Sequence, residues 1–342
     1  MRLAEEARCR TAQRREDHHS RETLRGRLIV SRVKPEASVS GLSRRQAVLA
    51  PFVGGIAALG LNGYAFAYAP AVQLNVTRYR IAPRQWALGP ALRIAVLTDL
   101  HFGEPFVSLG RLDEIVAATN SLAPDLICVL GDFEPGHRFV SRPVPRADWA
   151  RSLATLKAPL GVHTVLGNHD WWSDAEAQLR CSTVPLAGRA LMDAGLPVLD
   201  NEAVPLVKEG RRFWVVGLAD QLAYHVRGRH WIGRHDLAGA LAQVSDAAPI
   251  LMLAHEPDIF VNVPDSIALT LSGHTHGGQV RLLGYSPLVP SDYGNRYAYG
   301  HVVEGGRHLV VSGGLGPGKL PVRLGVPPEI VLIELLPPGR AA

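Results

Sequence analysis

Cysteine is scarce in this sequence of 342 residues. The three that occur, Cys9, Cys128 and Cys181, lie far apart and form no Cys-x-x-Cys pair. A small domain held together by disulfides and a cysteine-rich structural zinc site are therefore excluded. The residues around Cys128 are apolar, which is typical of a buried thiol that packs as a small hydrophobic side chain. The spacing does not favour a Cys128–Cys181 disulfide, and the count does not indicate the redox compartment.

Excess positive charge is absent from most of the chain, although the formal net charge is +5. Residues 1–45 hold 11 arginines and one lysine against six acidic residues. The rest of the chain holds 24 basic and 25 acidic side chains, a balance of −1. A protein that binds nucleic acid needs lysine and arginine clustered on its folded domain, and no such cluster occurs. We therefore expect no nucleic-acid partner.

Internal repeats are also absent, as is a collagen-like, coiled-coil or disordered composition. Hydrophobic residues make up 47% and charged residues 20% of the sequence, as in ordinary globular proteins. The length is sufficient for one large domain or two small ones with a substantial core.

The amino-terminal part separates into two segments of different composition. Residues 1–42 are rich in arginine and lack apolar periodicity, so we interpret them as a disordered extension or as the product of a start codon placed too far upstream. Residues 43–71 follow, and within them residues 46–71 are 26 consecutive uncharged positions. A helix of this length can cross a hydrocarbon core of about 30 Å. Pro51 and Asn62 weaken the run as a permanent membrane span.

The residues that flank the uncharged run are similar to an export signal. Ser43, Arg44 and Arg45 resemble a twin-arginine signal, although Ala47 stands where such signals prefer a bulky apolar residue. Residues 65–67 (AFA) offer a cleavage pattern of small residues. A cleaved signal, a retained membrane anchor and an apolar helix packed on the domain all stay open. With arginine on the amino-terminal flank, the positive-inside rule predicts a membrane-associated or exported protein whose main domain lies outside the cytoplasm.

Short apolar runs that end in polar residues recur from about residue 92 onwards. Each run is rich in valine, isoleucine and leucine, a pattern that predicts strands buried on both faces. Residues 108–124, between the first two runs, place apolar side chains at helical spacing, which predicts a parallel strand–helix–strand unit. The runs are RIAVLTD (93–99), DLICVLGD (125–132), VHTVLGNHD (162–170), RFWVVGLAD (212–220), PILMLAHEPD (249–258) and IALTLSGHTH (267–276).

Two further segments have the pattern of antiparallel hairpins. VPLVKEGRRFWVV (204–216) and HVVEGGRHLVVSGG (301–314) each join two apolar stretches through an EG or GG turn. Parallel units combined with hairpins predict an α/β fold of two packed mixed β-sheets flanked by helices, an αββα sandwich. We expect this domain to span residues 92–336, after a linker or lead-in strand at 72–91 and before a tail at 337–342.

Each of the six predicted strands is followed by histidine, aspartate or asparagine. In open α/β sheets, ligands bind beyond the carboxyl ends of the strands, so we expect these side chains to converge on one edge. Imidazole, carboxylate and amide groups without a thiolate suit Mn, Fe, Zn or Ni. The candidate donors are Asp99, His101, Asp132, Asn168, His169, Asp170, His255, His274 and His276.

This set is too large for one tetrahedral metal ion and suits two divalent or trivalent ions. Two ions about 3.5–4 Å apart clamp the attacking and leaving oxygens of a displacement at phosphorus, and a hydroxide that they share is a nucleophile near neutral pH. His274 and His276 are expected to point into one pocket, one for each ion, because side chains at i and i+2 of a strand share a face. Gly277 and Gly278 are expected to let the backbone turn close to the ions and to a bound phosphate.

Five short motifs in this order resemble the calcineurin-like metallophosphoesterase superfamily. The motif GD alone carries no information, but all five in order are specific. The resemblance covers residues 92–335. GHTHGGQ (273–279) and the tail SGGLGPGKLPVRLGVPPEIVLIEL (312–335) are more narrowly similar to the YkuE/YaeI-type branch, whose members commonly carry an export or membrane-anchoring leader. The motifs are DLH (99–101), GD (131–132), GNHD (167–170), the lone His255 and GHTH (273–276).

The resemblance implies two metal ions and a role for each matched residue. The first ion would be held by Asp99, His101 and His276. The second would be held by Asn168, His255 and His274, with Asp132 bridging the two.

The resemblance also implies a catalytic histidine. His169 would stabilise the phosphoryl charge or protonate the leaving group. Asp170 matches the acidic residue that follows it in the family and would orient neighbouring groups. The sequence departs from the family at Pro135, where members often have an acid or histidine that steadies the catalytic histidine. Glu134 or His137 could take this role, and the sequence does not choose between them.

The segment after GHTH is expected to set substrate choice. Long loops at an active edge often do so, and arginine suits a phosphate. The expected substrate contacts are Gly277, Gly278, Arg281 and Arg296.

These patterns predict a dinuclear-metal-dependent phosphohydrolase, either a phosphodiesterase or a pyrophosphatase. The expected substrate is a phosphoester or pyrophosphate, and the leader favours a cell-envelope or lipid-linked compound and contact with a membrane through residues 46–71. Two alternatives stay open. One is a nuclease of the same superfamily, which the near-zero charge of the domain disfavours. The other is a non-catalytic metal-binding scaffold, which would be expected to have lost ligands. The oligomeric state is not indicated.

Overall fold

The computed structural model describes residues 60, 62–181, 184–226 and 230–339. The extension predicted for residues 1–42 lies outside the described residues, and so does most of the segment 43–71. The described chain starts with a short π-helix, η2 (Tyr64–Tyr68), and one helical turn, α3 (Ala69–Ala71). Among the described residues, no helix combines the length and the apolar character that a membrane span requires.

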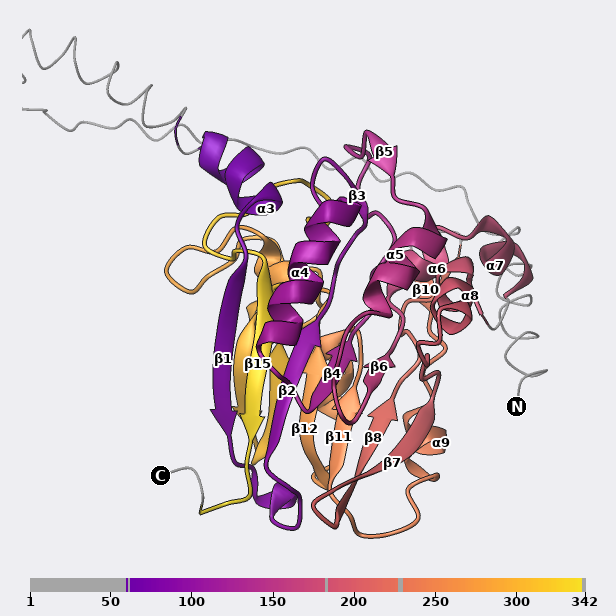
Figure 1. The fold of residues 1–342 in the computed structure, drawn as a ribbon, viewed down its shortest axis with the longest axis vertical. Coiled ribbons are helices and arrows are strands. Elements are labelled where there is room, and N and C mark those ends of the chain that lie inside the picture. Colours follow the sequence, from indigo (N-terminus) through magenta and orange to yellow (C-terminus); the bar gives the residue numbers. More distant parts are fainter. Residues whose placement is uncertain (1–59, 61, 182–183, 227–229, 340–342) are drawn as a thin grey trace, which may run out of the picture.

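The first of two large sheets has the strand order β1-β15-β2-β4-β6 (Figure 1). β15 runs antiparallel to β2, and the other neighbouring strands are parallel. The carboxyl-terminal strand β15 therefore lies between β1 and β2. The strands are β1 (Asn75–Ile81), β2 (Leu92–Leu97), β4 (Leu126–Val129), β6 (Val162–Thr164) and β15 (Glu329–Leu335).

The second large sheet has the strand order β13-β14-β12-β11-β8-β7. Its four central strands are parallel, and the hairpins β7–β8 and β13–β14 place an antiparallel strand at each edge. The strands are β7 (Glu202–Lys208), β8 (Arg211–Gly217), β11 (Ile250–Leu253), β12 (Ile267–Ser272), β13 (Gly300–Glu304) and β14 (Arg307–Val311).

The two sheets pack face to face around an apolar core. Ile94 and Val96 of the first sheet lie in one buried cluster with Phe213, Leu251 and Leu269 of the second. Cys128 belongs to the same cluster and carries a free thiol. Both inner faces are therefore buried. Because helices cover the outer faces, the central strands have continuous apolar sequences rather than alternating ones.

Helices cover the outer faces of the sheets. α4 (Leu109–Ser121), α5 (Arg146–Leu153) and α8 (Leu186–Asp193) pack on the first sheet. The side chain of Ser108 starts α4 by accepting the N–H of Arg111 at 3.2 Å. The remaining helices are η3 (Arg84–Trp86), α6 (Asn168–Trp172), α7 (Ala175–Arg180), α9 (Leu237–Leu241), η4 (Pro257–Asn262), η5 (His276–Gly278) and η6 (Gly294–Tyr297). Two small sheets pair β3 (Gly103–Glu104) with β5 (Arg142–Pro143) and β9 (Tyr224–Val226) with β10 (His230–Ile232).

The fold predicted from the sequence, two packed mixed sheets flanked by helices, is confirmed. All six buried strands and both hairpins are present, and α4 occupies the helical segment predicted at 108–124. β1 lies within the segment 72–91, where a linker or lead-in strand is predicted. The sequence patterns did not indicate the helices α5 to α9 or the insertion of β15 between β1 and β2.

Candidate metal centre

Loops at the carboxyl ends of five strands bring the candidate donors together. The N–H of His101 donates to the carbonyl of Asp132 at 2.9 Å, and the N–H of Gly273 donates to the carbonyl of His255 at 2.9 Å, so neighbouring loops are tied to one another. Both large sheets contribute donors to the same edge. In chain order these are Asp99 and His101 after β2, Asp132 after β4, Asn168 after β6, His255 after β11, and His274 and His276 after β12.

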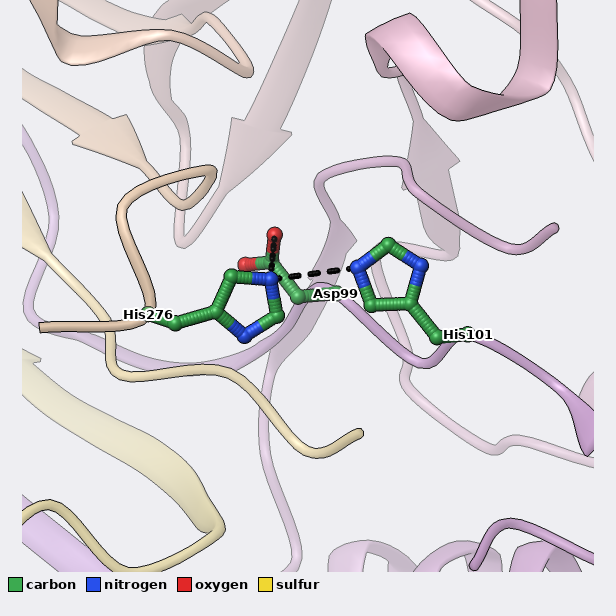
Figure 2. Close-up of side chains that lie close together, drawn as sticks. All are labelled: Asp99, His101 and His276. Atoms are coloured by element: carbon green, nitrogen blue, oxygen red, sulfur yellow. Dashed lines mark hydrogen bonds and ion pairs between the residues drawn. The ribbon is translucent and has the colours of Figure 1, made fainter. Parts of the chain in front are cut away.

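Asp99, His101 and His276 form a first buried group that could hold a metal ion. Figure 2 shows the carboxylate and the two imidazoles turned toward one another. The Nε2 atoms of His101 and His276 are 3.1 Å apart, and Nε2 of His276 lies 3.4 Å from Oδ1 of Asp99. Asp99 comes from the first sheet and His276 from the second, so this group joins the two.

Asp132, His255 and the half-buried His274 form a second group that could hold a metal ion. Nε2 of His255 lies 3.3 Å from Oδ2 of Asp132. The same Oδ2 atom lies 3.5 Å from Nε2 of His101 in the first group. Nδ1 of His274 lies 2.8 Å from Oδ1 of Asn168, which adds an amide oxygen to this side. Asp132 is therefore the carboxylate that lies between the two groups.

The outer nitrogen atoms of two imidazoles face backbone carbonyl oxygens. Nδ1 of His101 lies 2.7 Å from the carbonyl oxygen of Glu134, and Nδ1 of His255 lies 2.6 Å from that of Leu130. A carbonyl only accepts, so each Nδ1 carries the hydrogen. In a neutral ring Nε2 then keeps its lone pair for a metal ion.

Burial keeps most of the imidazoles neutral. It lowers the pKa of His101 to about 3 and the pKa of His274 to about 4. Burial and the charge of Arg323 together hold the pKa of His276 well below its usual value. A neutral imidazole is the form that binds a metal ion.

Asp132 and His255 instead form a charged pair. Burial alone would raise the pKa of Asp132, but His255 and His169 outweigh it and the pKa lies well below its usual value. Burial alone would lower the pKa of His255, but Asp132 raises it well above its usual value. A metal ion at this position would replace the proton that His255 carries.

Five of the donor residues have left-handed backbone. Their φ values are 51° for Asp99, 46° for His101, 56° for Asp132, 67° for His274 and 50° for His276. Residues other than glycine rarely adopt this conformation, and its cost is about 1–3 kcal/mol at each position. His274 and His276 lie beyond the end of β12, so strand alternation is not the reason that they reach one pocket. The left-handed turns place one imidazole in each group.

Glycine is required where the loops approach the donors most closely. A Cβ atom on Gly167 would lie 2.4 Å from Oδ1 of Asp132, and one on Gly273 would lie 2.1 Å from Oγ1 of Thr98. Gly277 and Gly278 have φ values of 59° and 74°. A Cβ atom on Gly278 would lie 2.5 Å from Cβ of Ser286, so Gly278 also makes room for the loop that follows.

The Asp170 carboxylate anchors the backbone around Asp132. It accepts the N–H groups of Asp132 and Gly167 at 2.9 Å, of Phe133 at 2.8 Å and of Glu134 at 3.1 Å. Asp170 is buried and belongs to neither of the two donor groups. It therefore acts on the site by fixing the loop that carries Asp132.

His169 lies against the first donor group. Its ring packs edge-on against His101, with the ring centroids 5.0 Å apart, and against Trp172 at 5.1 Å. Its backbone N–H donates to Oδ1 of Asp132 at 2.9 Å. Within the described part of the chain its imidazole has no hydrogen-bond partner. Packing rather than an acidic partner sets the orientation of this ring.

Neither of the two residues considered as a partner for His169 fills that position. Glu134 binds Arg146 through both carboxylate oxygens, at 2.6 and 3.1 Å. Nδ1 of His137 accepts the N–H of Phe139 at 3.1 Å, and its ring packs on Phe106.

Arg323 contacts the first donor group, and the sequence patterns did not indicate this role. It is fully buried, and its guanidinium donates to the carbonyl oxygens of Gly313 and Gly316. Its Nη2 atom lies 3.1 Å from Nδ1 of His276. Arginine only donates, so in this structure Nδ1 of His276 accepts and Nε2 carries the ring hydrogen. Metal binding at Nε2 therefore requires the other neutral tautomer, with the ring hydrogen on Nδ1, and a shift of the Arg323 guanidinium away from that atom.

Arg281 and Arg296 make contacts within their own region. Nη1 of Arg281 donates to Oγ of Ser286 at 3.2 Å. Arg296 forms a two-pronged ion pair with Glu304 at 2.8 and 2.7 Å. Among the described residues, neither guanidinium contacts a donor of the two groups. Substrate binding by these arginines, and by Gly277 and Gly278, stays a prediction.

The donors fit a pair of metal ions. The set holds four imidazoles, two carboxylates and one amide, with no thiolate, which suits a catalytic rather than a structural site. Nε2 of His255 is buried and faces Oδ2 of Asp132 at 3.3 Å without forming a hydrogen bond of good geometry among the described residues. A cation between the two atoms would give both of them a ligand bond.

Comparison with known proteins identifies the family of this chain. The family model of the calcineurin-like phosphoesterases matches residues 92–278, more than half of the chain. The protein belongs to the calcineurin-like phosphoesterase family. It is therefore a hydrolase that acts on phosphoester bonds. The resemblance drawn from the five motifs is confirmed.

Several relatives of this phosphoesterase have been named. The chain is 29% identical over 303 residues to the uncharacterized metallophosphoesterase YkuE of Bacillus subtilis, covering 86% of this chain and 98% of that protein. It is 30% identical over 265 residues to the phosphodiesterase YaeI of Escherichia coli, covering 77% and 88%. It is 28% identical over 316 residues to a transmembrane protein with metallophosphoesterase domain of Danio rerio, covering 91% and 67%.

Proposed function

We propose that this phosphoesterase is a dinuclear-metal phosphodiesterase or pyrophosphatase that cleaves a cell-envelope or lipid-linked substrate. The observation that carries the proposal is the position of Asp132, whose Oδ2 atom lies between His101 of one donor group and His255 of the other. A carboxylate in this position can bridge two ions. The name of the relative YaeI, a phosphodiesterase, supports diester cleavage.

Each donor has a proposed role in holding the ions. Asp99, His101 and His276 hold the first ion. Asn168, His255 and His274 hold the second, and Asp132 bridges. Bound ions supply activation of water and positive charge at the phosphoryl group. Manganese, iron, zinc and nickel all suit these ligands.

His169 is proposed as the catalytic histidine. It follows Asn168 directly, and its ring packs on His101, so it lies against the first donor group. Burial, outweighing the charge of Asp132, lowers the pKa of His169. We propose that its imidazole stabilises the phosphoryl charge or donates a proton to the leaving group. Asp170 acts through the loop that it holds, as a positioning residue.

Lys319 is a further candidate for contact with the substrate phosphate. It is exposed, and its positive charge contributes to the lowered pKa of His169, which places it within electrostatic reach of the site. A compact, flexible cation suits a phosphate oxygen.

Action at the extracytoplasmic face of a membrane is part of the proposal. The uncharged residues 46–71, the twin-arginine-like start at residue 43 and the positive-inside rule support it. The relative from Danio rerio is named a transmembrane protein, which is consistent with this location.

The proposed function is tested with the purified full-length chain loaded separately with Mn, Fe, Zn or Ni. An aryl phosphodiester, an aryl phosphomonoester and a nucleotide–lipid pyrophosphate are offered as substrates. We expect hydrolysis of the diester or the pyrophosphate. His274→Ala should abolish it, whereas His163→Gln, at a buried histidine in β6 outside the two donor groups, should not.

Other outcomes separate the alternatives. Inertness of the metal-loaded protein toward all three substrates would indicate a scaffold. DNA cleavage accompanied by a steep fall of DNA affinity with salt would indicate a nuclease.

A further inference from the structure

The helical segment that enters the domain is apolar on its exposed faces. Tyr64, Phe66, Tyr68 and Val72 are 39%, 47%, 52% and 55% exposed, whereas Ala65 is buried against the domain. No charged residue occurs between residues 46 and 77. A surface helix of a soluble domain normally has a polar face, and an apolar helix without one is covered by other apolar material.

A second apolar feature is the loop that follows the metal centre. Leu282, Leu283, Tyr285 and Leu288 are 59%, 108%, 63% and 80% exposed. Backbone hydrogen bonds in both directions between residues 282 and 285, each 2.9 Å, close a tight turn. Leu283 is at its tip with a φ of 49°, followed by Gly284 at 81°. Such turns favour asparagine or glycine, so a fully exposed leucine here has no local structural reason.

These two features are joined through the segment around Leu320. The N–H of Arg323 donates to the carbonyl of Ala65 at 2.9 Å, and the N–H of Arg281 donates to the carbonyl of Leu324 at 2.8 Å. Leu320 is itself 52% exposed. Figure 1 shows α3 next to these loops, at the end of the first sheet where β1 begins and β2 and β4 finish. We call residues 64–72, Leu282–Leu288 and Leu320 together the apolar rim.

We propose that the apolar rim rests on the surface of a lipid bilayer and turns the metal centre toward lipid head groups. The proposal rests on the proposed function and adds a contact made by the catalytic domain itself. The sequence that precedes the rim favours a bilayer as the apolar material that covers it, because the uncharged residues 46–59 lead directly into the rim. Tyrosine and phenylalanine beside leucine are the side chains found where a protein meets the membrane interface.

The rim and the metal centre are coupled through short chain connections. Leu282 follows His276 by six residues, and a Cβ atom on the intervening Gly278 would collide with Ser286 and with the carbonyl oxygen of Leu288. Docking of the loop at a bilayer would therefore fix the distance between the head groups and the donors. A phosphate ester carried by a lipid fits this arrangement better than a soluble ester does.

The test places a probe at the loop tip of the full-length chain. Leu283→Cys is labelled with an environment-sensitive fluorophore and mixed with vesicles of phosphatidylethanolamine and phosphatidylglycerol that contain a lipid-borne quencher. Leu88→Cys is the matched control, since Leu88 is 68% exposed but precedes β2, at the opposite end of the sheets. Unsubstituted protein, labelled in parallel, corrects for any label on the native cysteines.

We expect quenching at residue 283 to exceed that at residue 88 at least threefold. Equal quenching at the two positions would overturn the proposal. So would a probe that is shielded without vesicles, because residues 46–59 or a second copy of the chain would then cover the rim. Shielding that depends on protein concentration would identify the second copy.

A kinetic comparison separates this proposal from the proposed function. In the Leu282→Ser/Leu283→Ser variant, hydrolysis of a phosphodiester carried in vesicles should fall by about tenfold or more, because two apolar side chains that would enter the bilayer interface are replaced by polar ones. Hydrolysis of a soluble aryl phosphodiester should be unchanged. An unchanged rate on both substrates would refute the docking surface and leave the hydrolase intact, whereas no hydrolysis of either substrate by unsubstituted protein would refute the proposed function.

Discussion

The buried carboxylate of Asp170 accepts the backbone N–H of Asp132 at 2.9 Å, and so holds the residue that lies between the two donor groups. The same carboxylate accepts three further N–H groups from Gly167, Phe133 and Glu134. In Asp170→Asn the side-chain NH₂ would face at least one of these donors. We expect a loss of about 2–3 kcal/mol in the free energy of unfolding.

The same variant should lower metal affinity by about 10- to 100-fold, as loss of an outer partner of a metal site typically does. Urea unfolding and metal titration measure the two effects. Asp174→Asn is the control, because Asp174 also accepts backbone N–H groups, those of Glu176, Ala177 and Leu186, but away from the site. A destabilised Asp174→Asn protein with normal metal affinity is expected. Normal metal affinity in Asp170→Asn would show that the loop does not need this anchor.

Asp132 should be the donor on which both ions depend. Asp132→Asn keeps the shape of the side chain but removes the charge between His101 and His255. We expect the content of both metal ions to fall and phosphodiesterase activity to drop more than about 100-fold, since even outer partners cost about 10- to 100-fold. His276→Ala, in one group only, should reduce binding of one ion more than the other. Elemental analysis of the two variants, with activity in parallel, would contradict the bridging role if Asp132→Asn retained both ions.

Gly167 should not tolerate a methyl group. A Cβ atom there would lie 2.4 Å from Oδ1 of Asp132 and 2.6 Å from Cε1 of His255, so one donor must move. Gly167→Ala is expected to reduce activity by about 100-fold, as displacements of about 1 Å do. Gly110→Ala is the control, because its Cβ atom would meet only Oγ of Ser108 at 3.9 Å in α4. That control should keep activity and gain about 0.5–1 kcal/mol of stability.

His163 should make stability depend on pH. Burial lowers its pKa from the usual 6.5, because the ring lies in β6 with Nδ1 unpartnered among the described residues. Below the unfolded value the unfolded chain binds a proton that the folded chain does not, so stability is present above about pH 6.5 and is lost as the pH falls. In His163→Gln the decrease in unfolding free energy between about pH 7.5 and about pH 5.5 should be smaller.

Urea unfolding at the two pH values measures the difference for His163. His235→Gln, at an exposed histidine, is the comparison and should keep the pH dependence of the unsubstituted protein. The same slope in His163→Gln and in the unsubstituted protein would remove His163 as the cause.

The strands and the convergence of the candidate donors could be predicted because each depends on short stretches of sequence. Apolar runs such as that of β12 indicate burial on both faces, and the polar residues after them lie at the carboxyl edge whichever strands are neighbours. The membership of the two groups came from the family resemblance, and the structure places His276 with Asp99 and His274 with Asp132 accordingly.

The supporting contacts could not be predicted, because they join positions far apart in the sequence. Asp170 has its partners up to 38 residues away, and Arg323 lies 47 residues from His276. Nothing in the sequence around Arg323 indicates that its charge is buried. The left-handed backbone conformation of Asp99 and His101 could not be predicted either, since aspartate and histidine adopt this conformation only where the surrounding loops enforce it. The exposed Leu283 reads as an ordinary loop residue until its turn and its neighbours are known.

Each donor group draws on both layers of the sandwich. Asp99 and His101 extend from one layer and His276 from the other, while Asp132 faces His255 and His274 across the same gap. Cations at these positions would link the two sheets along one edge, whereas the sheets are joined by apolar packing in the core. Removal of the metal ions should therefore loosen the contact between the two sheets first at the candidate metal centre.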